Sequence, residues 1–332
     1  MNDVIEGIRK NDFVVVGRVG LDLFPTEVGI GIEEATSFTK DMGGSSANIA
    51  AGIVKLGGKA ALVTSVSDDA VGRTCQTMLR DKYGVDDTYV NTVGGEARNS
   101  LALYESRIAG HQSVIYRNGA ADFEMTEDDV RAVDYQRFGA LVTAGTVFAA
   151  EPSRTAAFTA FDLARKAGLP IIFDVDYRPY SWPSPQVAAD VLSRAGALSD
   201  VIVGNDEEFG FMAGGIEKGL DKARELAATT ASIVVYKMGE HGAVTITKDG
   251  ELRTGIYNVT ALKPTGAGDS FMAGMLSSIA DGYELEEAVL RGSACAAIVV
   301  GKPGCAPAMP YPADLTEFLN THPGASVPRD EG

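Results

Sequence analysis

The chain has 332 residues, of which 45 are acidic and 29 are basic, so its formal net charge is −16; hydrophobic residues make up 45% of it. This composition is typical of a folded globular protein and excludes a disordered chain, a collagen and a coiled coil. The excess of carboxylates repels polyanions at long range, so we expect no nucleic-acid-binding surface and only local binding of phosphates.

Short apolar runs alternate with amphipathic stretches along the chain. Six runs rich in Val, Ile and other apolar residues predict buried strands: Phe13–Val16, Ala60–Val66, Leu141–Gly145, Ile171–Val175, Val201–Val203 and Ile233–Tyr236. Seven stretches predict helices: Ser46–Leu56, Ala70–Lys82, Arg154–Lys166, Gln186–Ala197, Leu220–Ala228, Gly268–Ala280 and Leu285–Val300. This alternation is typical of an α/β fold in which helices cover both faces of a largely parallel sheet.

Two regions break the alternation. Residues 21–41 and 97–117 are predicted to form strands and turns, and inserted β-segments of this kind often form a lid or a dimer contact. No linker rich in Pro, Ser or charge divides the chain. We therefore expect a single domain over residues 11–320, followed by a flexible tail over residues 321–332.

Targeting and thiol signals are weak. Residues 1–11 lack the apolar segment of a secretory signal, and the nearly uncharged stretch Phe138–Ala150 is too short to span a bilayer. Cys75, Cys295 and Cys305 have no paired spacing and are too few for a disulfide framework or a structural zinc site. We therefore expect a cytoplasmic protein that has reduced thiols and does not associate with a membrane.

The strongest motif is Thr265–Ser270, directly ahead of a predicted helix. Its small residues let the backbone approach a ligand closely, and the free N–H groups at a helix N-terminus form an anion site. Asp269 lies in the first turn beside them. A tight turn with a helix-favouring acid would look the same, but a base beside an anion site is what transfer of a phosphoryl group to a hydroxyl requires.

A second glycine-rich turn into a helix, Gly43–Asn48, carries hydroxyls and an amide suited to a polyol. Ser45 or Ser46 as an ordinary helix cap is the alternative interpretation. Asp22 follows the first predicted strand, where a carboxylate at the C-terminal edge of a parallel sheet can accept hydrogen bonds from sugar hydroxyls.

Two further strand ends carry polar groups. Strand alternation places Asp174 and Asp176 on the same side, and Arg178 just beyond could reach a carboxylate or a phosphate, although a surface ion-pair cluster is the alternative. Asn205 and Glu208 share a face of a first helical turn and could order waters around Mg²⁺. A reciprocal helix cap explains their spacing equally well.

Other nucleotide motifs are incomplete. A phosphate loop ending at Lys59 would need its first glycine at Ile53 and a Ser or Thr at Ala60, and Gly29–Glu34 lacks the third glycine of a dinucleotide fingerprint. An NAD-dependent oxidoreductase is therefore disfavoured.

With these motifs in this order, the chain resembles the ribokinase (PfkB) family of sugar kinases from about Phe13 to Pro310. Gly43–Asn48 matches the first family signature, and Gly266–Asp269 matches the second. The resemblance implies a three-layer, ribokinase-like α/β fold with a mostly parallel central sheet and a small β lid. It also implies ATP and Mg²⁺ as cofactors and phosphorylation of a sugar hydroxyl.

The resemblance also implies roles for single residues. Asp269 would be the catalytic base, and the N–H groups of Gly266, Ala267 and Gly268 would form the anion site. The residues expected to hold the sugar are Asp22, Gly43, Gly44, Asn48 and Asp176. Asn205 and Glu208 would organise Mg²⁺ through water. The residues expected at the nucleotide are Asn205, Lys237, Gly239 and Gly242 for the phosphates and ribose, and Ala297 for the adenine. A β-hairpin turning at Gly239 and Gly242 would have the same sequence.

The sequence departs from the family at Lys263 and Pro264, where the second signature usually has Asp-Thr. That aspartate helps to hold a monovalent cation in relatives that bind one. We expect the ammonium group of Lys263 to take over part of the electrostatic role of the cation, so that activation by K⁺ is weak or absent.

Within the family, the segments Gly17–Asp22, Tyr116–Arg117 and Asp174–Trp182 resemble kinases of keto-deoxy sugar acids. The acceptor carboxylate needs local cations, for which Arg117 and Arg178 are the expected partners, although Arg178 could instead contact the transferring phosphate. Other acceptors (2-keto-3-deoxygluconate, fructose or a nucleoside) and a sugar-sensing homologue without catalysis stay open. The exposed lid faces predict a homodimer.

Overall fold

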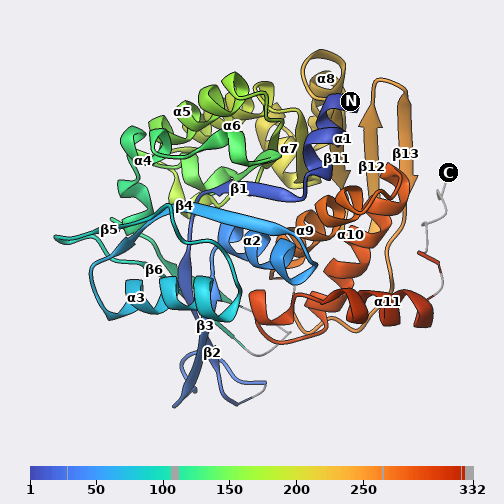
Figure 1. Ribbon diagram of the computed structural model, residues 1–332. Coiled ribbons are helices and arrows are strands. Elements are labelled where there is room, and N and C mark those ends of the chain that lie inside the picture. Colours follow the sequence, from blue (N-terminus) through green and yellow to red (C-terminus); the bar gives the residue numbers. More distant parts are fainter. Residues whose placement is uncertain (28, 106–111, 264, 323, 326–332) are drawn as a thin grey trace.

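The computed structural model describes residues 1–27, 29–105, 112–263, 265–322 and 324–325. Its centre is a nine-stranded sheet in the order β13-β12-β11-β10-β9-β8-β1-β4-β5 (Figure 1). The strands are β1 Asp12–Val16, β4 Lys59–Ser67, β5 Val90–Val93, β8 Ala140–Ala144, β9 Ile171–Asp174, β10 Val201–Asn205, β11 Ile233–Lys237, β12 Ala243–Thr247 and β13 Gly250–Thr254. Neighbours from β5 to β11 pair in parallel, and β12 and β13 continue the sheet antiparallel.

Helices cover both faces of this sheet. They are α1 Asn2–Arg9, α2 Ser45–Lys55, α3 Ala70–Thr77, α4 Glu127–Arg131, α5 Ser153–Lys166, α6 Pro185–Ala197, α7 Asp206–Ala213, α8 Gly219–Thr229, α9 Ala267–Ala280, α10 Leu285–Val300 and α11 Pro312–Thr321. One face packs against α1, α2, α9, α10 and α11, and the other against α4 to α8. The predicted α/β architecture of three layers is confirmed. In the described part of the chain no helix is long and apolar enough to cross a membrane.

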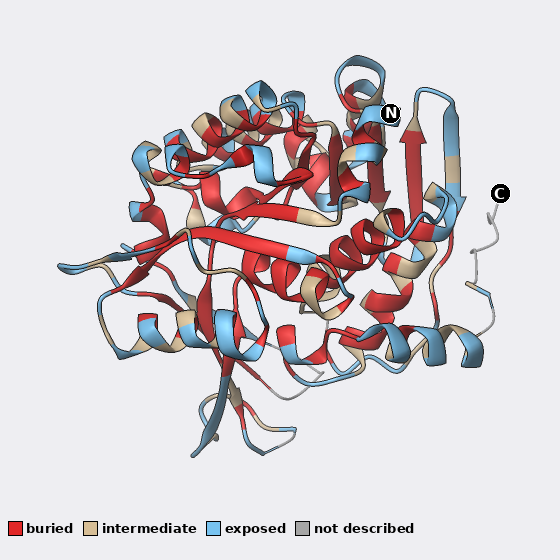
Figure 2. Cartoon of the chain, viewed as in Figure 1, coloured by how far each residue is buried: buried red, intermediate tan, exposed pale blue. Residues whose placement is uncertain are grey.

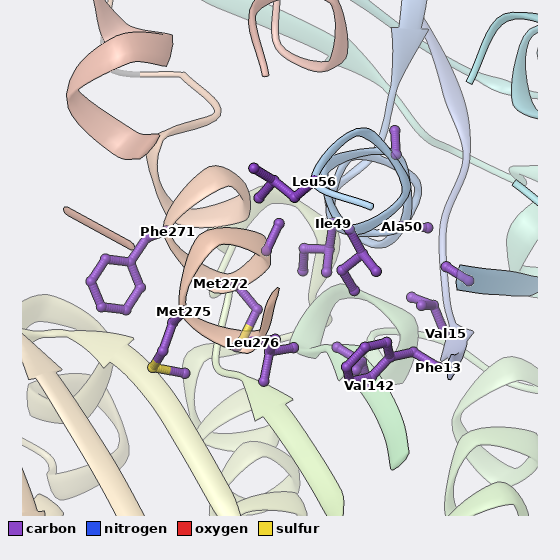
Figure 3. Close-up of a cluster of buried hydrophobic side chains, with 14 of the residues drawn as sticks. Phe13, Val15, Ile49, Ala50, Leu56, Val142, Phe271, Met272, Met275 and Leu276 are labelled. Carbon is purple, nitrogen blue, oxygen red and sulfur yellow. The ribbon is translucent and has the colours of Figure 1, made fainter. Parts of the chain in front are cut away.

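Strand β1 shows how the two apolar layers arise. Successive side chains of a strand point to opposite faces, so Phe13 and Val15 enter one core cluster while Val14 and Val16 enter the other. All four are buried, and burying an apolar side chain of this size contributes roughly 1.5–3 kcal/mol. Figure 3 shows the first cluster, where residues of α2 and α9 meet the sheet. Figure 2 shows the buried strands between more exposed helices.

The two irregular regions form a separate four-stranded sheet in the order β3-β2-β6-β7 (Figure 1). Its strands are β2 Gly20–Pro25, β3 Phe38–Gly43, β6 Ser100–Tyr104 and β7 Ser113–Tyr116. Strands β2 and β6 pair in parallel, and the two outer pairs are antiparallel. The predicted β lid is confirmed, although residues 28 and 106–111 within it lie outside the described part. The predicted tail at 321–332 likewise lies largely outside it.

The helix predicted over residues 70–82 changes character before its end. Helix α3 ends at Thr77, and a π-helical turn spans Met78–Lys82. At the end of this turn, Lys82 and Tyr83 both donate hydrogen bonds to the carboxylate of Asp41 on β3. The turn therefore ties the lid to the central domain.

Candidate functional site

The N-terminus of α9 is built around a glycine. Gly266 has φ +84°, a conformation that favours glycine, and ends the preceding loop without a side-chain cap on the helix. A Cβ added there would also lie 3.1 Å from the Sγ atom of Cys305. The first N–H groups of α9 therefore have no side-chain acceptor, and they can bind an anion.

Asp269 lies in the first turn of α9, partly exposed to solvent. Its carboxylate accepts a hydrogen bond of 2.8 Å from Nδ2 of Asn48 on α2. Loss of surrounding water, together with the nearby carboxylate of Asp176, raises the pKa of Asp269 to about 6, against the hydrogen bond from Asn48. A carboxylate with this pKa is ionised at neutral pH and can still accept a proton.

Helix α2 begins opposite α9 with a similar turn. Gly44 has φ +99°, and a Cβ on Gly43 would overlap the carboxylate of Asp22, 1.9 Å from its Oδ1 atom. The interpretation of a serine as the helix cap is wrong: Gly44 holds the cap position, and Ser45 instead donates its hydroxyl to Asp176. The Ser45 hydroxyl and the Asn48 amide thus face the carboxylates of Asp176 and Asp269 rather than their own helix end.

Asp22 lies on β2, at the base of the lid, and is buried. Neither of its carboxylate oxygens has a hydrogen-bond partner among the described residues. Burial raises the pKa of Asp22 to about 7, with Arg18 opposing the shift and Asp269 adding to it. Since buried polar atoms are almost always paired, these two oxygens indicate a ligand that donates hydrogen bonds, such as a polyol.

The loop after β9 departs from the strand geometry expected for it. Strand β9 ends at Asp174, and Asp176 has φ +35°, so the two carboxylates are not placed by strand alternation. Asp176 is buried, accepts a hydrogen bond from Ser45 and forms an ion pair with Nη2 of Arg178 at 2.8 Å. The turn brings Asp176 under α2, while Arg178 stays half exposed.

Asn205 and Glu208 form a reciprocal cap at the start of α7. The side chain of each accepts a hydrogen bond of 2.8 Å from the backbone N–H of the other. The second oxygen of Glu208 accepts from the N–H of Tyr177 at 3.3 Å. The reciprocal helix cap, one of the two interpretations of this spacing, is therefore present in the structure. Because both Glu208 oxygens are occupied, these residues suit a Mg²⁺ ion held through water.

Lys237 connects this region with α9. It ends β11, directly beside Asn205 in the parallel register. A Cβ added to Gly268 would lie 3.4 Å from its Nζ atom, so the ammonium group reaches the first turn of α9. Asp174 and Glu208 are also in its electrostatic field, and burial raises the pKa of both. Lys237 is placed to meet a phosphate near α9.

The remaining residues predicted at the nucleotide lie on two elements. Gly239 and Gly242 form the turn of the antiparallel hairpin β11–β12, both with positive φ, so the hairpin interpretation is realised here. Ala297 lies on α10 and is buried. A cavity of about 850 Å³ between α6 and α7 is lined by Arg178, Asn205 and Glu208 but not by Asp269. The cavity therefore adjoins the residues predicted at Mg²⁺ and the phosphates rather than Asp269.

Lys263 lies beside the loop into α9 and is buried. Its ammonium group donates to the backbone carbonyls of Thr265, at 2.5 Å, and of Val299, at 3.4 Å. Burial lowers its pKa, and the carboxylates of Asp269 and Asp22 act in the opposite direction. A cation thus already sits among carbonyl oxygens close to the anion site. Pro264 lies outside the described residues.

The arginines are distributed differently from the sequence expectation. Arg117 is buried and ion-paired with Asp122, which no motif had indicated. Arg18, which we did not predict as a site residue, is buried close enough to act electrostatically on Asp22 and Arg117. The available signal was its place between the first strand and Asp22, because arginine is seldom buried without a partner. Among the described residues, no group of three or more His, Cys, Asp or Glu side chains could hold a metal ion.

Comparison with known proteins agrees with this geometry. The model of the pfkB family of carbohydrate kinases matches residues 10–312. A 5-dehydro-2-deoxygluconokinase of Geobacillus kaustophilus is 36% identical over 323 residues, which cover 96% of each chain. Fructokinase of Vibrio cholerae, solved with fructose, ADP and calcium ion, is 25% identical with a TM-score of 0.81, covering 93% of this chain and 99% of the other.

A double mutant of the Vibrio cholerae fructokinase was solved with fructose, ADP and potassium ion. It is 26% identical with a TM-score of 0.80 and covers 93% of this chain and 98% of its own. Both the family model and the full-length relative span far more than half of the sequence. The chain belongs to the pfkB family of carbohydrate kinases.

Proposed function

We propose that this protein transfers the γ-phosphate of MgATP to a primary hydroxyl of a keto-deoxy sugar acid, 5-dehydro-2-deoxy-D-gluconate. The observation that carries the proposal is the meeting of α2, α9 and the lid. There Asp269 lies at a helix N-terminus without a side-chain cap, near the carboxylate of Asp22, which has no hydrogen-bond partner among the described residues. The relative from Geobacillus kaustophilus supports this acceptor by its name.

The chain's own residues divide the work. Asp22, with the Gly43–Asn48 turn, accepts and donates hydrogen bonds that orient the sugar hydroxyls. Asp269 takes the proton of the attacking hydroxyl while Asn48 fixes its carboxylate. The N–H groups at Gly266, Ala267 and Gly268 stabilise charge that develops on the transferring group. Because phosphoryl transfer needs little activation of the nucleophile, positioning and electrostatics dominate.

The phosphates of ATP fit the opposite side of the same edge. Lys237 and Arg178 supply positive charge there, Gly239 and Gly242 leave room at the hairpin turn, and Ala297 lies on the helix expected beside the adenine. A bound Mg²⁺ ion would supply positive charge that neutralises the phosphate oxygens. Asn205 and Glu208 would hold it through water, which agrees with the preference of Mg²⁺ for a partly hydrated state.

We further infer that residues 11–320 form a single kinase domain. We also infer that the enzyme acts in the cytoplasm, where ATP is the phosphate donor. A homodimer would form through the lid. Lys263 supports a site that does not depend on potassium, because its ammonium group occupies the carbonyl environment beside α9.

The proposal is tested by a panel of acceptors in a coupled ADP assay. The panel contains 5-dehydro-2-deoxy-D-gluconate, 2-keto-3-deoxygluconate, fructose and a nucleoside. We expect the highest kcat/KM with the first compound. A higher kcat/KM with another acceptor would reassign the substrate, and no ADP release with any acceptor would support a sensing protein without catalysis.

A further inference from the structure

Arg18 is a buried cation without a counterion among the described residues. It lies two residues after the end of β1, and only 7% of its surface is exposed. Within the described part of the chain, its hydrogen bond runs from Nη1 to the hydroxyl of Ser100 on β6, at 2.8 Å, and its Nε atom is buried with no partner. No carboxylate of a described residue forms an ion pair with it, although leaving a buried charge unpaired costs several kcal/mol.

Arg117 lies near Arg18 and has two more hydrogen-bond donors without a partner among the described residues. It is 6% exposed; Nη2 pairs with Asp122, while Nε and Nη1 are buried without partners. Asp122 acts electrostatically on both arginines, and the two guanidinium groups repel one another. Two buried cations thus share one ion-paired carboxylate, which leaves positive charge and at least three donor nitrogens for an anion.

This pair lies on the sugar side of the site. The cations acting most strongly on Asp22 are Arg18 and Lys263, whereas those acting on Asp269 are Arg178 and Lys237. Arg178 is also committed to Asp176 by its ion pair. Asp176 also lies in the electrostatic field of Arg178, Arg18 and Arg117. Arg18 and Arg117 differ from Arg178 in having buried donor nitrogens without a partner among the described residues.

The backbone leaves room for this arginine. A Cβ added to Gly20 would lie 3.0 Å from Nη1 of Arg18 and 2.6 Å from Oγ of Ser100. Glycine at this position of β2 leaves space for the guanidinium group beside Ser100 of the lid strand β6. The lid and the central domain therefore both contribute to the surroundings of Arg18.

We propose that Arg18, together with Arg117, binds the carboxylate of the acceptor and makes the site select sugar acids over neutral sugars. The inference rests on the proposed function, since it requires an acidic acceptor. It also fits the shape of that acceptor, whose carboxylate and primary hydroxyl are at opposite ends of the chain, while Asp22 binds hydroxyls between them. A guanidinium group suits a carboxylate because its donors form a fixed fork.

The experiment compares 5-dehydro-2-deoxy-D-gluconate with its methyl ester, which has the same hydroxyls and no charge. In Arg18→Gln, we expect KM for the acid to rise about 30- to 5,000-fold, the range for truncating one partner of a buried charge pair. The KM for the ester should change less than about threefold on the same principle, since no ion pair is lost. The acid-to-ester ratio of kcat/KM should therefore collapse.

Two further variants keep the test decisive. Arg18→Lys retains the charge but not the fork, so the ratio should fall by a smaller factor even if Arg18→Gln does not fold. Arg154→Gln is the matched control: Arg154 donates to the backbone carbonyls of Phe148 and Ala149, and its loss should leave the ratio unchanged.

The proposed function and the role of Arg18 would be contradicted by different results. If the wild-type protein phosphorylates neither compound, the proposed function is wrong. If it prefers the acid and both Arg18 variants keep that preference, the function stands and the role of Arg18 is wrong.

Discussion

Asp269 is the residue whose ionisation should control the rate. The variant Asp269→Asn keeps the size of the side chain but cannot accept a proton, so we expect kcat to fall about 10²- to 10⁴-fold with a modest change in KM. Steady-state kinetics with saturating MgATP measure both parameters. Near-normal turnover in the variant would contradict the assignment.

The pH profile of the wild-type protein gives a second readout of the same residue. The pKa of Asp269 is raised to about 6 and that of Asp22, which we place at the sugar, to about 7. We therefore expect kcat/KM to decline as the pH falls through about 7, where Asp22 takes up a proton, and to decline further through about 6, where Asp269 loses the ionised form that accepts the proton. The limb near pH 6 should be absent from the residual activity of Asp269→Asn.

Lys263 should make the enzyme insensitive to potassium. Replacing Na⁺ with K⁺ should change kcat of the wild-type protein less than about twofold, because the ammonium group already neutralises the carbonyl environment near α9. In Lys263→Met, the rate should fall and K⁺ should restore part of it. Lys55→Met is the matched control, since Lys55 also donates to two backbone carbonyls, those of Ala306 and Pro307. A several-fold activation of the wild-type protein by K⁺ would refute this role.

At the scale of elements, the N-terminus of α9 should tolerate no side chain at its first glycine. Gly266→Ala would place a Cβ 3.1 Å from Cys305 and hold alanine at φ +84°, at a cost of about 1–2 kcal/mol for the backbone alone. We expect a lower melting temperature and, because the N–H groups shift, a lower kcat. Gly57→Ala is the control: it has φ +99° and open space around the added atom, so its melting temperature should also drop, but kcat should not change.

The sequence predicted elements well wherever a local pattern determines them. Apolar runs such as that of β1 are buried on both faces, so composition alone identifies them as inner strands. Helices α1 and α11 were not predicted, because each buries only a narrow stripe, represented by Val4, Ile8 and Leu315. The ends of elements were less certain: β9 stops at Asp174, and a turn with positive φ at Asp176 has no signature in the side chain itself.

The site was predictable to the extent that its groups lie in one motif. Gly266 and Asp269 are three residues apart in one motif, so the sequence predicted both the anion site and the base beside it. The ion pair of Arg117 with Asp122, and the exposure of Arg18 to the field of Asp22, depend on how the lid packs on the central sheet. Long-range packing of this kind leaves no local pattern.

At the scale of the whole molecule, the lid offers a surface for a second copy of the chain. Its outer strands β3 and β7 carry the exposed side chains of Phe38, Val114 and Tyr116. We expect light scattering to give twice the mass of one chain, since burying these side chains is favourable, and Tyr116→Asp to shift the protein toward the monomer. A monomeric wild-type protein at assay concentration would contradict the dimer.

The net charge of −16 also has a meaning at this scale. An acidic surface repels both ATP and a sugar acid, so under the proposed function binding would depend on the cations of the site, Arg18, Arg117, Arg178 and Lys237.

The central claim is that this site phosphorylates the primary hydroxyl of a sugar acid. The most direct measurement incubates the purified protein with MgATP and 5-dehydro-2-deoxy-D-gluconate and follows the products by phosphorus NMR. The account predicts a new phosphate monoester, coupled to the protons of the terminal CH₂ group, in amounts equal to the ADP formed. Release of inorganic phosphate without a monoester, or a monoester at another hydroxyl, would contradict it.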